Sequence, residues 1–158
     1  MRILFVCLGN ICRSPLAEAI FKSKIVQKGL DTKVFTDSCG TSNYHIGDTP
    51  DPRTLRNAMK NGIEIQHVGR QIHESDLTSF DIIFAMDKSN YENILKLKNA
   101  TTYKSKVKLL REFDPVKGHE VPDPYFGEEQ GFQDVFEMLD RSLDHFINQL
   151  ERQQLLNQ

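Results

Sequence analysis

The sequence predicts an α/β fold in a single domain: a three-layer sandwich in which a central four-stranded parallel sheet is covered by helices on both faces. Three observations predict it. The 158 residues are enough for one compact core and too few for two domains of ordinary size. Four short apolar runs alternate with amphipathic windows, an order that implies crossover connections between parallel strands. The first run, at residues 2–7, is hydrophobic almost throughout, which is typical of a strand buried on both faces.

The four strands are expected where short apolar runs are bounded by polar or turn-forming residues. Each run is far shorter than an average helix, which favours strands over buried helical segments. The predicted strands are residues 2–7, 33–38, 81–86 and 106–110.

The helices are recognised by how they start and stop. Ser14 can cap the first helix, Pro15 stands at its first helical position, and Gly29 ends it. The same pattern recurs with Asp51 as the cap of a second helix and Pro52 in its first turn, followed by a glycine after its last turn. Two further helices are expected at residues 88–97 and 132–150.

A long connection at residues 111–131, rich in proline, glycine and acidic residues, separates the last strand from the last helix. Connections of this length are unusual in a small domain and often carry function. We therefore expect this segment to contribute to a site. The domain is expected to cover residues 1–150, with a polar tail at residues 151–158.

Composition and charge argue against several classes of protein. A net charge of −2 gives no basic surface for nucleic acid or for an anionic membrane. The longest apolar run, residues 3–8, is too short for a signal sequence or a membrane span. The three cysteines lack Cys-x-x-Cys spacing, which argues against a disulfide framework and a structural zinc site. Free thiols suit a reducing compartment, so a cytoplasmic location is expected.

The loop CLGNICRSP at residues 7–15 connects the first strand to the first helix. In an open parallel sheet a loop at this place binds ligands, and the amino terminus of the following helix favours an anion. The loop matches neither of the glycine-rich nucleotide-binding patterns. It does carry Cys7 at its start and Arg13 six residues later, a spacing that can curl both side chains around a tetrahedral oxyanion. The guanidinium of Arg13 suits two phosphate oxygens, and its charge favours the nucleophilic thiolate of Cys7.

The string VCLGNICRSP resembles the signature of the low-molecular-weight protein tyrosine phosphatases, Cys-x5-Arg-[Ser/Thr] close to the amino terminus. The resemblance covers nearly the whole chain. It implies hydrolysis of phosphotyrosine in a protein, or of an aryl phosphate, with no metal or cofactor required. It extends through DSCGTS at 37–42, HVGRQI at 67–72, FDIIFAMD at 80–87 and VPDPYFG at 121–127.

The resemblance also implies a role for individual residues. Cys7 would attack the phosphorus, Arg13 would bind the phosphate, and Asp123 would protonate the leaving oxygen and then activate water. Ser14 would donate its hydroxyl to the sulfur of Cys7. The residues expected to bind the phosphate are Leu8, Gly9, Asn10, Ile11, Cys12, Arg13 and Ser14.

Aromatic side chains are expected to form the wall of the substrate pocket. By resemblance, Tyr125 and Phe126 stand at its entrance, and Tyr44 supplies a second wall. A deep aromatic pocket would admit a phenyl phosphate and would hold the shorter phosphoserine away from the buried sulfur. Specificity for phosphotyrosine would then follow from the length of its side chain, which brings the phosphate to the sulfur.

A supporting network is expected behind the loop. The resemblance implies that Asn10, in a left-handed backbone conformation, braces the loop together with Ser14 through Ser38 and His67. Cys12 has two interpretations that stay open: a packing residue or, as the resemblance implies, the partner of Cys7 in a reversible disulfide.

Three other functions fit parts of the pattern. Protein arginine phosphatases share the fold and the loop but typically carry threonine where this chain has Ile11, and the isoleucine favours phosphotyrosine. Arsenate reductases coupled to thioredoxin need two further cysteines, and only Cys39 remains. A phosphate-binding module or redox sensor without turnover would have no need of Asp123. The physiological substrate is left open, as is the choice between a monomer and a weakly self-associating protein.

Overall fold

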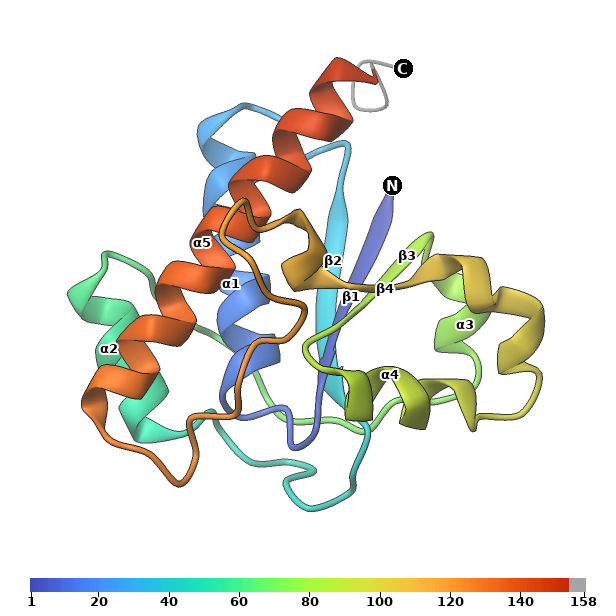
Figure 1. Cartoon of the computed structure of the whole chain (residues 1–158), viewed down its shortest axis with the longest axis horizontal. Helices are drawn as coiled ribbons and strands as arrows, with labels where there is room; N and C mark the ends of the chain where they lie inside the picture. The colour runs from blue at the N-terminus through green and yellow to red at the C-terminus, as the bar shows by residue number, and fades with distance from the viewer. Residues whose placement is uncertain (154–158) are drawn as a thin grey trace.

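The centre of the molecule is a parallel sheet of four strands in the order β2-β1-β3-β4 (Figure 1). The computed structural model describes residues 1–153. The predicted fold class is confirmed, the bounds of the first strand match the prediction, and those of the other three differ from it by one or two residues at each end. The strands are β1 (Arg2–Cys7), β2 (Phe35–Gly40), β3 (Ile82–Ala85) and β4 (Val107–Leu109).

The strands end together at one edge of the sheet. The register pairs Cys7 of β1 with Gly40 of β2, and Val6 of β1 with Ala85 of β3. Because all strands run the same way, the loops that follow them converge on this edge, which is the lower one in Figure 1. The tertiary structure thereby gathers segments that lie far apart in the sequence.

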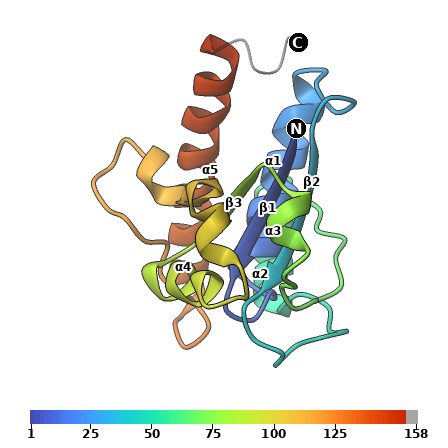
Figure 2. The ribbon, with the colours of Figure 1, turned by 90° about the vertical axis from the view of Figure 1, so that its right-hand side faces the viewer.

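Helices cover both faces of the sheet (Figures 1 and 2). One face carries α1 (Arg13–Gln27), α2 (Pro52–Lys60) and α5 (Glu129–Arg152). The other carries α3 (Asp76–Ser79) and α4 (Lys88–Leu95), which Figure 2 shows in front of the strands. Two 3-10 helices, η1 (Ala100–Lys106) and η2 (Leu110–Phe113), flank β4.

The period-two alternation of β1 divides the core into two layers. Ile3 and Phe5 belong to the apolar cluster that includes residues of α1 and α5, whereas Leu4 and Val6 belong to the cluster on the side of α3 and α4. All four side chains are fully buried. Burial on both faces explains why this strand is hydrophobic almost throughout.

The helix boundaries correct one detail of the sequence prediction. Asp51 caps α2 as expected, because its carboxylate accepts a hydrogen bond from the N–H of Arg53 at 2.8 Å. Ser14 does not cap α1, which begins at Arg13 with Cys12 in the capping position and no side-chain cap. The Ser14 hydroxyl oxygen lies instead 3.0 Å from the sulfur of Cys7, so a contact within the loop replaces the local cap.

Three short helical segments, α3, η1 and η2, were not predicted. Each has seven residues or fewer, too short to show a helical repeat. At the other end of the chain, α5 continues through Glu151 and Arg152, so the predicted polar tail begins inside this helix. Residues 154–158 of that tail lie outside the described residues. Within residues 1–153, no helix has the length and apolar character needed to cross a membrane.

Candidate active site

In the loop between β1 and α1, three carbonyl groups point outward, toward the neighbouring segments of the chain. The carbonyl oxygens of Cys7 and Leu8 accept hydrogen bonds from the N–H groups of Thr41 and Ser42 at 2.9 and 3.0 Å. The carbonyl oxygen of Ile11 accepts the N–H of Asp51 at 2.8 Å. Asn10 has a φ of 57°, the left-handed conformation predicted for it. Outward carbonyls and a left-handed residue are the features of a loop whose N–H groups surround an anion.

Gly40 at the end of β2 permits the loop to lie this close to the sheet. A Cβ atom at this position would stand 2.7 Å from the carbonyl oxygen of Leu8 and 3.2 Å from the nitrogen of Asn10. Both contacts are with backbone atoms, which cannot rotate away as a side chain can. The position therefore requires glycine because of space, not because of its φ angle.

The sulfur of Cys7 lies at the base of this loop, and the residue as a whole is almost fully buried, at 2% exposure. The N–H of Asn10 donates to it at 3.2 Å, and the hydroxyl oxygen of Ser14 lies 3.0 Å away. The side-chain amide of Asn10 donates to that same hydroxyl oxygen at 2.8 Å, which leaves the hydroxyl proton of Ser14 two acceptors, the sulfur of Cys7 at 3.0 Å and the carbonyl oxygen of Cys39 at 3.3 Å. A backbone N–H and a hydroxyl group are therefore both within hydrogen-bond distance of the sulfur.

Arg13 is a buried cation surrounded by acidic groups. Its Nη1 donates to the carboxylate of Asp87 at 2.7 Å and to the carbonyl of Val121 at 2.9 Å, while Nη2 lies 3.6 Å from the carboxylate of Asp123. Burial acts to lower the pKa of Arg13, but the negative charges of Cys7 and Asp87 outweigh burial and raise its pKa. The guanidinium therefore stays charged in a site from which water is largely excluded.

Asp123 comes from the long connection between η2 and α5. Its side chain is 41% exposed, and its carboxylate accepts the N–H of Tyr125 at 3.1 Å. Val121, two residues before Asp123, is fully buried. Its N–H donates a hydrogen bond to the carbonyl oxygen of Met86, just after β3. The buried Val121 thus fixes the backbone so that the accessible carboxylate of Asp123 faces Arg13.

A pocket of about 210 Å³ opens above the sulfur. Its floor is formed by the loop and its walls by the three aromatic residues predicted for this role. Tyr125 and Phe126 pack edge to face with ring centroids 5.0 Å apart, and Phe126 is 96% exposed. The lining residues are Cys7, Leu8, Gly9, Ile11, Cys12, Arg13, Tyr44, His45, Asp123, Tyr125 and Phe126.

The predicted supporting residues meet behind the loop. The side-chain amide of Asn10 donates to Ser38 Oγ at 3.0 Å, and its carbonyl oxygen lies 2.7 Å from Nε2 of His67. Ser38 Oγ is also within 3.3 Å of that ring nitrogen. The N–H of Arg70 donates to the same Asn10 oxygen at 3.0 Å. Together with the hydrogen bond to Ser14, these contacts mean that four residues hold the side chain of Asn10 in place.

Cys12 lines the same pocket but differs chemically from Cys7. Burial raises the pKa of Cys12 to about 12, and the negative charge of nearby Asp51 acts in the same direction. The thiol of Cys12 therefore stays protonated near neutral pH. All three cysteines of the chain are free, and a reversible disulfide between Cys7 and Cys12 stays a prediction.

Comparison with known proteins assigns this arrangement to a family. The model of the low molecular weight phosphotyrosine protein phosphatases matches residues 2–156. The chain belongs to the low molecular weight phosphotyrosine protein phosphatase family. A member of this name from Schizosaccharomyces pombe is 44% identical over 152 residues, which are 95% of this chain and 97% of the relative.

Solved structures of phosphatases share the whole fold. The protein tyrosine phosphatase of Entamoeba histolytica has a TM-score of 0.92 and 40% sequence identity, covering 98% of this chain and 99% of its own. The YwlE arginine phosphatase has a TM-score of 0.88 and 29% identity, covering 99% of both chains. Phosphatases that act on two kinds of phosphorylated residue are therefore similar to this chain.

Three residues of this phosphatase site were missed by sequence reasoning. Gly40 and Asp87 each stand at or just beyond the carboxyl end of a strand, the edge where parallel sheets place ligands, and this position could have identified them. Arg70 lies in the string HVGRQI that carries part of the resemblance, but its segment is neither helix nor strand and has no apolar repeat, so nothing singled out this residue within the string. Its guanidinium pairs with Asp37 and Asp76, which fixes the segment whose N–H contacts Asn10.

Proposed function

We propose that the site of this low molecular weight protein tyrosine phosphatase hydrolyses phosphotyrosine through a cysteinyl-phosphate intermediate. One observation carries the proposal: a buried sulfur, a buried guanidinium and an accessible carboxylate face one pocket above a loop with outward carbonyls. The three residues are Cys7, Arg13 and Asp123, which we assign as nucleophile, phosphate-binding cation and acid–base group.

The first step transfers the phosphoryl group to sulfur. The loop N–H groups and the guanidinium of Arg13 would hold the three non-bridging oxygens. Among the described residues, Nε and Nη2 of Arg13 donate no hydrogen bond, so both are available for phosphate oxygens. The thiolate of Cys7 forms the S–P bond while the bond between phosphorus and the phenolic oxygen breaks. Asp123 gives its proton to that oxygen, which leaves as tyrosine.

The second step releases phosphate. Asp123, now a carboxylate, takes a proton from water as the water oxygen attacks phosphorus. The S–P bond breaks and its electron pair returns to Cys7 as the thiolate. The hydroxyl of Ser14, 3.0 Å from the sulfur, would stabilise this negative charge and make the sulfur a better leaving group. No electrons are exchanged with any other group, and the enzyme ends in its starting state.

The shape and lining of the pocket support an aryl substrate. Cys7 is almost fully buried beneath aromatic walls, so a phosphate would reach its sulfur only on a long side chain. Ile11 at the floor is apolar and gives no hydrogen bond to a guanidino group. We therefore favour phosphotyrosine over phosphoarginine, and a phosphorylated protein or a small aryl phosphate would both fit.

A reducing compartment suits the proposed chemistry. All three cysteines are free, and a nucleophilic thiolate is lost on oxidation. We propose that the protein acts in the cytoplasm as a monomer that at most self-associates weakly.

Rapid mixing with p-nitrophenyl phosphate tests the nucleophile and the acid. We expect a burst of p-nitrophenol equal to the enzyme concentration, because phosphorylation of Cys7 releases the phenol before water attacks. Cys7→Ser should abolish the burst. Asp123→Ala should slow hydrolysis of a phosphotyrosine peptide about 100-fold or more, since its basic leaving group needs a proton. The nitro group makes the departing phenolate a weaker base, which needs a proton less. The same variant should therefore lose less activity with p-nitrophenyl phosphate.

Asp31→Ala is the matched control, because Asp31 is exposed and lies outside the pocket. It should retain full activity with both substrates. Equal losses with both substrates in Asp123→Ala would contradict its role as the acid. Faster hydrolysis of phosphoarginine than of phosphotyrosine would favour the arginine phosphatase alternative. Stoichiometric phosphate binding without turnover would favour a binding module.

A further inference from the structure

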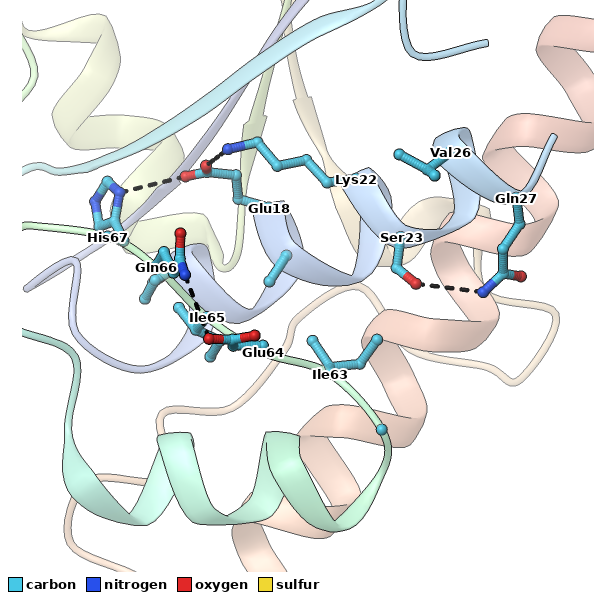
Figure 3. Close-up of a pocket in the computed structure, with 13 residues that line it drawn as sticks. Glu18, Lys22, Ser23, Val26, Gln27, Ile63, Glu64, Ile65, Gln66 and His67 are labelled. Atoms are coloured by element: carbon cyan, nitrogen blue, oxygen red, sulfur yellow. Dashed lines mark hydrogen bonds and ion pairs between the residues drawn. The ribbon is translucent and has the colours of Figure 1, made fainter. Parts of the chain in front are cut away.

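Helix α2 leads to a different cavity at each of its ends. Its carboxyl end runs into the segment 62–67, which borders a cavity of about 620 Å³ beside α1 (Figure 3). In that cavity the buried carboxylate of Glu18 is paired with His67. The amino end of α2 meets the proposed active site, because the N–H of its capping residue Asp51 donates to a carbonyl oxygen of the phosphate loop at 2.8 Å. Arg53, in the first turn of α2, has no role in the reaction proposed above.

The guanidinium of Arg53 is held between a carboxylate and two aromatic rings. Nε and Nη2 donate to the two oxygens of Asp51 at 3.1 and 2.8 Å, which makes a two-point ion pair. The guanidinium carbon lies 4.7 Å from the ring centre of Phe132 and 5.3 Å from that of Tyr125, within the range of a cation–π contact. Arg53 therefore joins the cap of α2 to the aromatic wall of the pocket.

Phe132 gives this contact a fixed base on the phosphate loop. It stands near the start of α5, is buried at 3% exposure, and packs with Ile11 and Cys12 of the loop. The cap of α2 contacts the same part of the loop, since its N–H donates to the carbonyl oxygen of Ile11. Arg53 is thus placed by two groups, Asp51 and Phe132, that both contact the phosphate loop.

The segment that carries the proposed acid has few attachments of its own. Within residues 1–153, no hydrogen bond joins residues 122–127 to any other part of the chain, and the two that they form lie inside the segment. Pro124 is buried, and Asp123 forms an ion pair with Arg13 at 3.6 Å. The position of this segment therefore depends on side-chain contacts, and the contact of the Tyr125 ring with the guanidinium described above is one of them.

We propose that Arg53 is a positioning residue for the acid. By holding the ring of Tyr125, it keeps Asp123 at the place from which its carboxyl group reaches the leaving oxygen. The link between the two is short, because the N–H of Tyr125 donates to the carboxylate of Asp123 at 3.1 Å. This inference rests on the proposed function, in which Asp123 gives a proton to the substrate. Arg53 does not line the pocket and acts only through Tyr125.

Kinetics with two leaving groups test the proposal. Arg53→Ala should lower kcat/KM for a phosphotyrosine peptide about tenfold or more, because a displaced acid protonates the basic leaving group poorly. The loss with p-nitrophenyl phosphate should be smaller, since its leaving group needs a proton less. Arg56→Ala is the matched control, because Arg56 is exposed and lies about one turn further along the same helix. It should keep full activity with both substrates.

A double-mutant cycle separates positioning of the acid from a general loss of structure. In an Asp123→Ala background, Arg53→Ala should change the rate with phosphotyrosine by less than about twofold, because the group that it positions is gone. Arg53→Lys keeps a cation beside Asp51 but lacks the planar group that lies against the rings, so it should show a smaller loss of the same kind. Thermal unfolding checks that each variant is folded. Where Arg53→Ala is not, Arg53→Lys serves for the same comparison.

Three results would overturn the proposal: unchanged activity in Arg53→Ala, equal losses with both substrates, or a loss that adds fully to that of Asp123→Ala. In each case the burst of p-nitrophenol in the unsubstituted protein and the effect of Asp123→Ala would still support the proposed function. Absence of that burst would instead remove the proposed function, and this inference with it.

Discussion

At the scale of single residues, the site depends on Arg13, whose charge is buried to 2% exposure. An isolated buried cation is strongly unfavourable, and it is tolerated here because Asp87 and the carbonyl of Val121 both accept from Nη1. These partners fix the plane of the guanidinium before substrate arrives. A lysine could not replace Arg13, because an ammonium group lacks the planar set of N–H donors that can bind two phosphate oxygens at once.

The two pocket cysteines should differ in reactivity. At about pH 7 we expect iodoacetamide to modify Cys7 and to leave Cys12 unmodified, because only the thiolate is reactive. Burial raises the pKa of Cys12 to about 12, so its thiolate is scarce at neutral pH and increases only as the pH rises toward that value. Peptide mass spectrometry after timed labelling measures both sites, and we expect rates that differ about 100-fold or more.

Added vanadate should protect Cys7 from labelling, because it occupies the phosphate loop. Labelling of all three cysteines in denaturant is the control for access. Rapid modification of Cys12 in folded Cys7→Ser protein would contradict the prediction, since no competing thiolate remains there.

At the scale of elements, the phosphate loop is shaped by its neighbour β2. Three loop carbonyls are held from outside by the segments after β2 and before α2, and Gly40 lies under the loop. The loop therefore takes its form from tertiary contacts as well as from the left-handed Asn10. Its N–H groups are arranged in advance, which spares the reorganisation that a flexible loop would need during catalysis.

Gly40→Ala should displace the phosphate loop. The added methyl group would stand 2.7 Å from the carbonyl oxygen of Leu8, so the backbone must move. A shift of about 1 Å in a catalytic group costs about 100-fold in rate, and we expect kcat/KM for p-nitrophenyl phosphate to fall by this order. Steady-state kinetics and vanadate inhibition measure the effect.

Gly131→Ala provides the control for this substitution. Gly131 lies in α5, and a methyl group there meets nothing within 4 Å. Activity should be unchanged, and stability should rise by about 0.5–1 kcal/mol, since alanine suits a helix better than glycine. Full activity in Gly40→Ala would mean that the loop does not need its close approach to β2.

At the scale of the whole molecule, an aromatic cluster joins the sheet to the last helix. The ring of Phe84 on β3 lies 4.9 Å from that of Phe146 on α5, and 5.8 Å from those of Phe5 and Phe113. The cluster unites residues from both ends of the chain on one face of the sheet. It also packs the carboxyl-terminal half of α5 against the sheet through Phe146.

Phe84→Ala should lower the free energy of unfolding by about 3–5 kcal/mol, because Phe84 is fully buried and a cavity would remain. Denaturant unfolding followed by circular dichroism measures the change. Phe126→Ala removes the same atoms at a position that is 96% exposed and should change stability by less than about 0.5 kcal/mol. Similar losses in the two variants would argue against this cluster as a main part of the core.

The sequence by itself determined the fold class, the four strands and the loop with Cys7 and Arg13, because these follow from local patterns: apolar runs, capping residues and spacing within one loop. It also pointed to Asp123, Asn10 and His67, although only through resemblance to a family. Their roles remain proposals. The strand ends and the short helices were misplaced or missed, since a few residues carry too little periodicity to locate a boundary.

Only the tertiary structure decided which distant groups meet. Asp87 at the end of β3 and the carbonyl of Val121 reach the guanidinium of Arg13, and Gly40 of β2 makes room for the phosphate loop. The facing pair of Glu18 and His67 arises in the same way, from a helix and a loop 49 residues apart in the chain. Such contacts depend on strand order and register, which bring residues together through the sheet and leave no local pattern in the sequence.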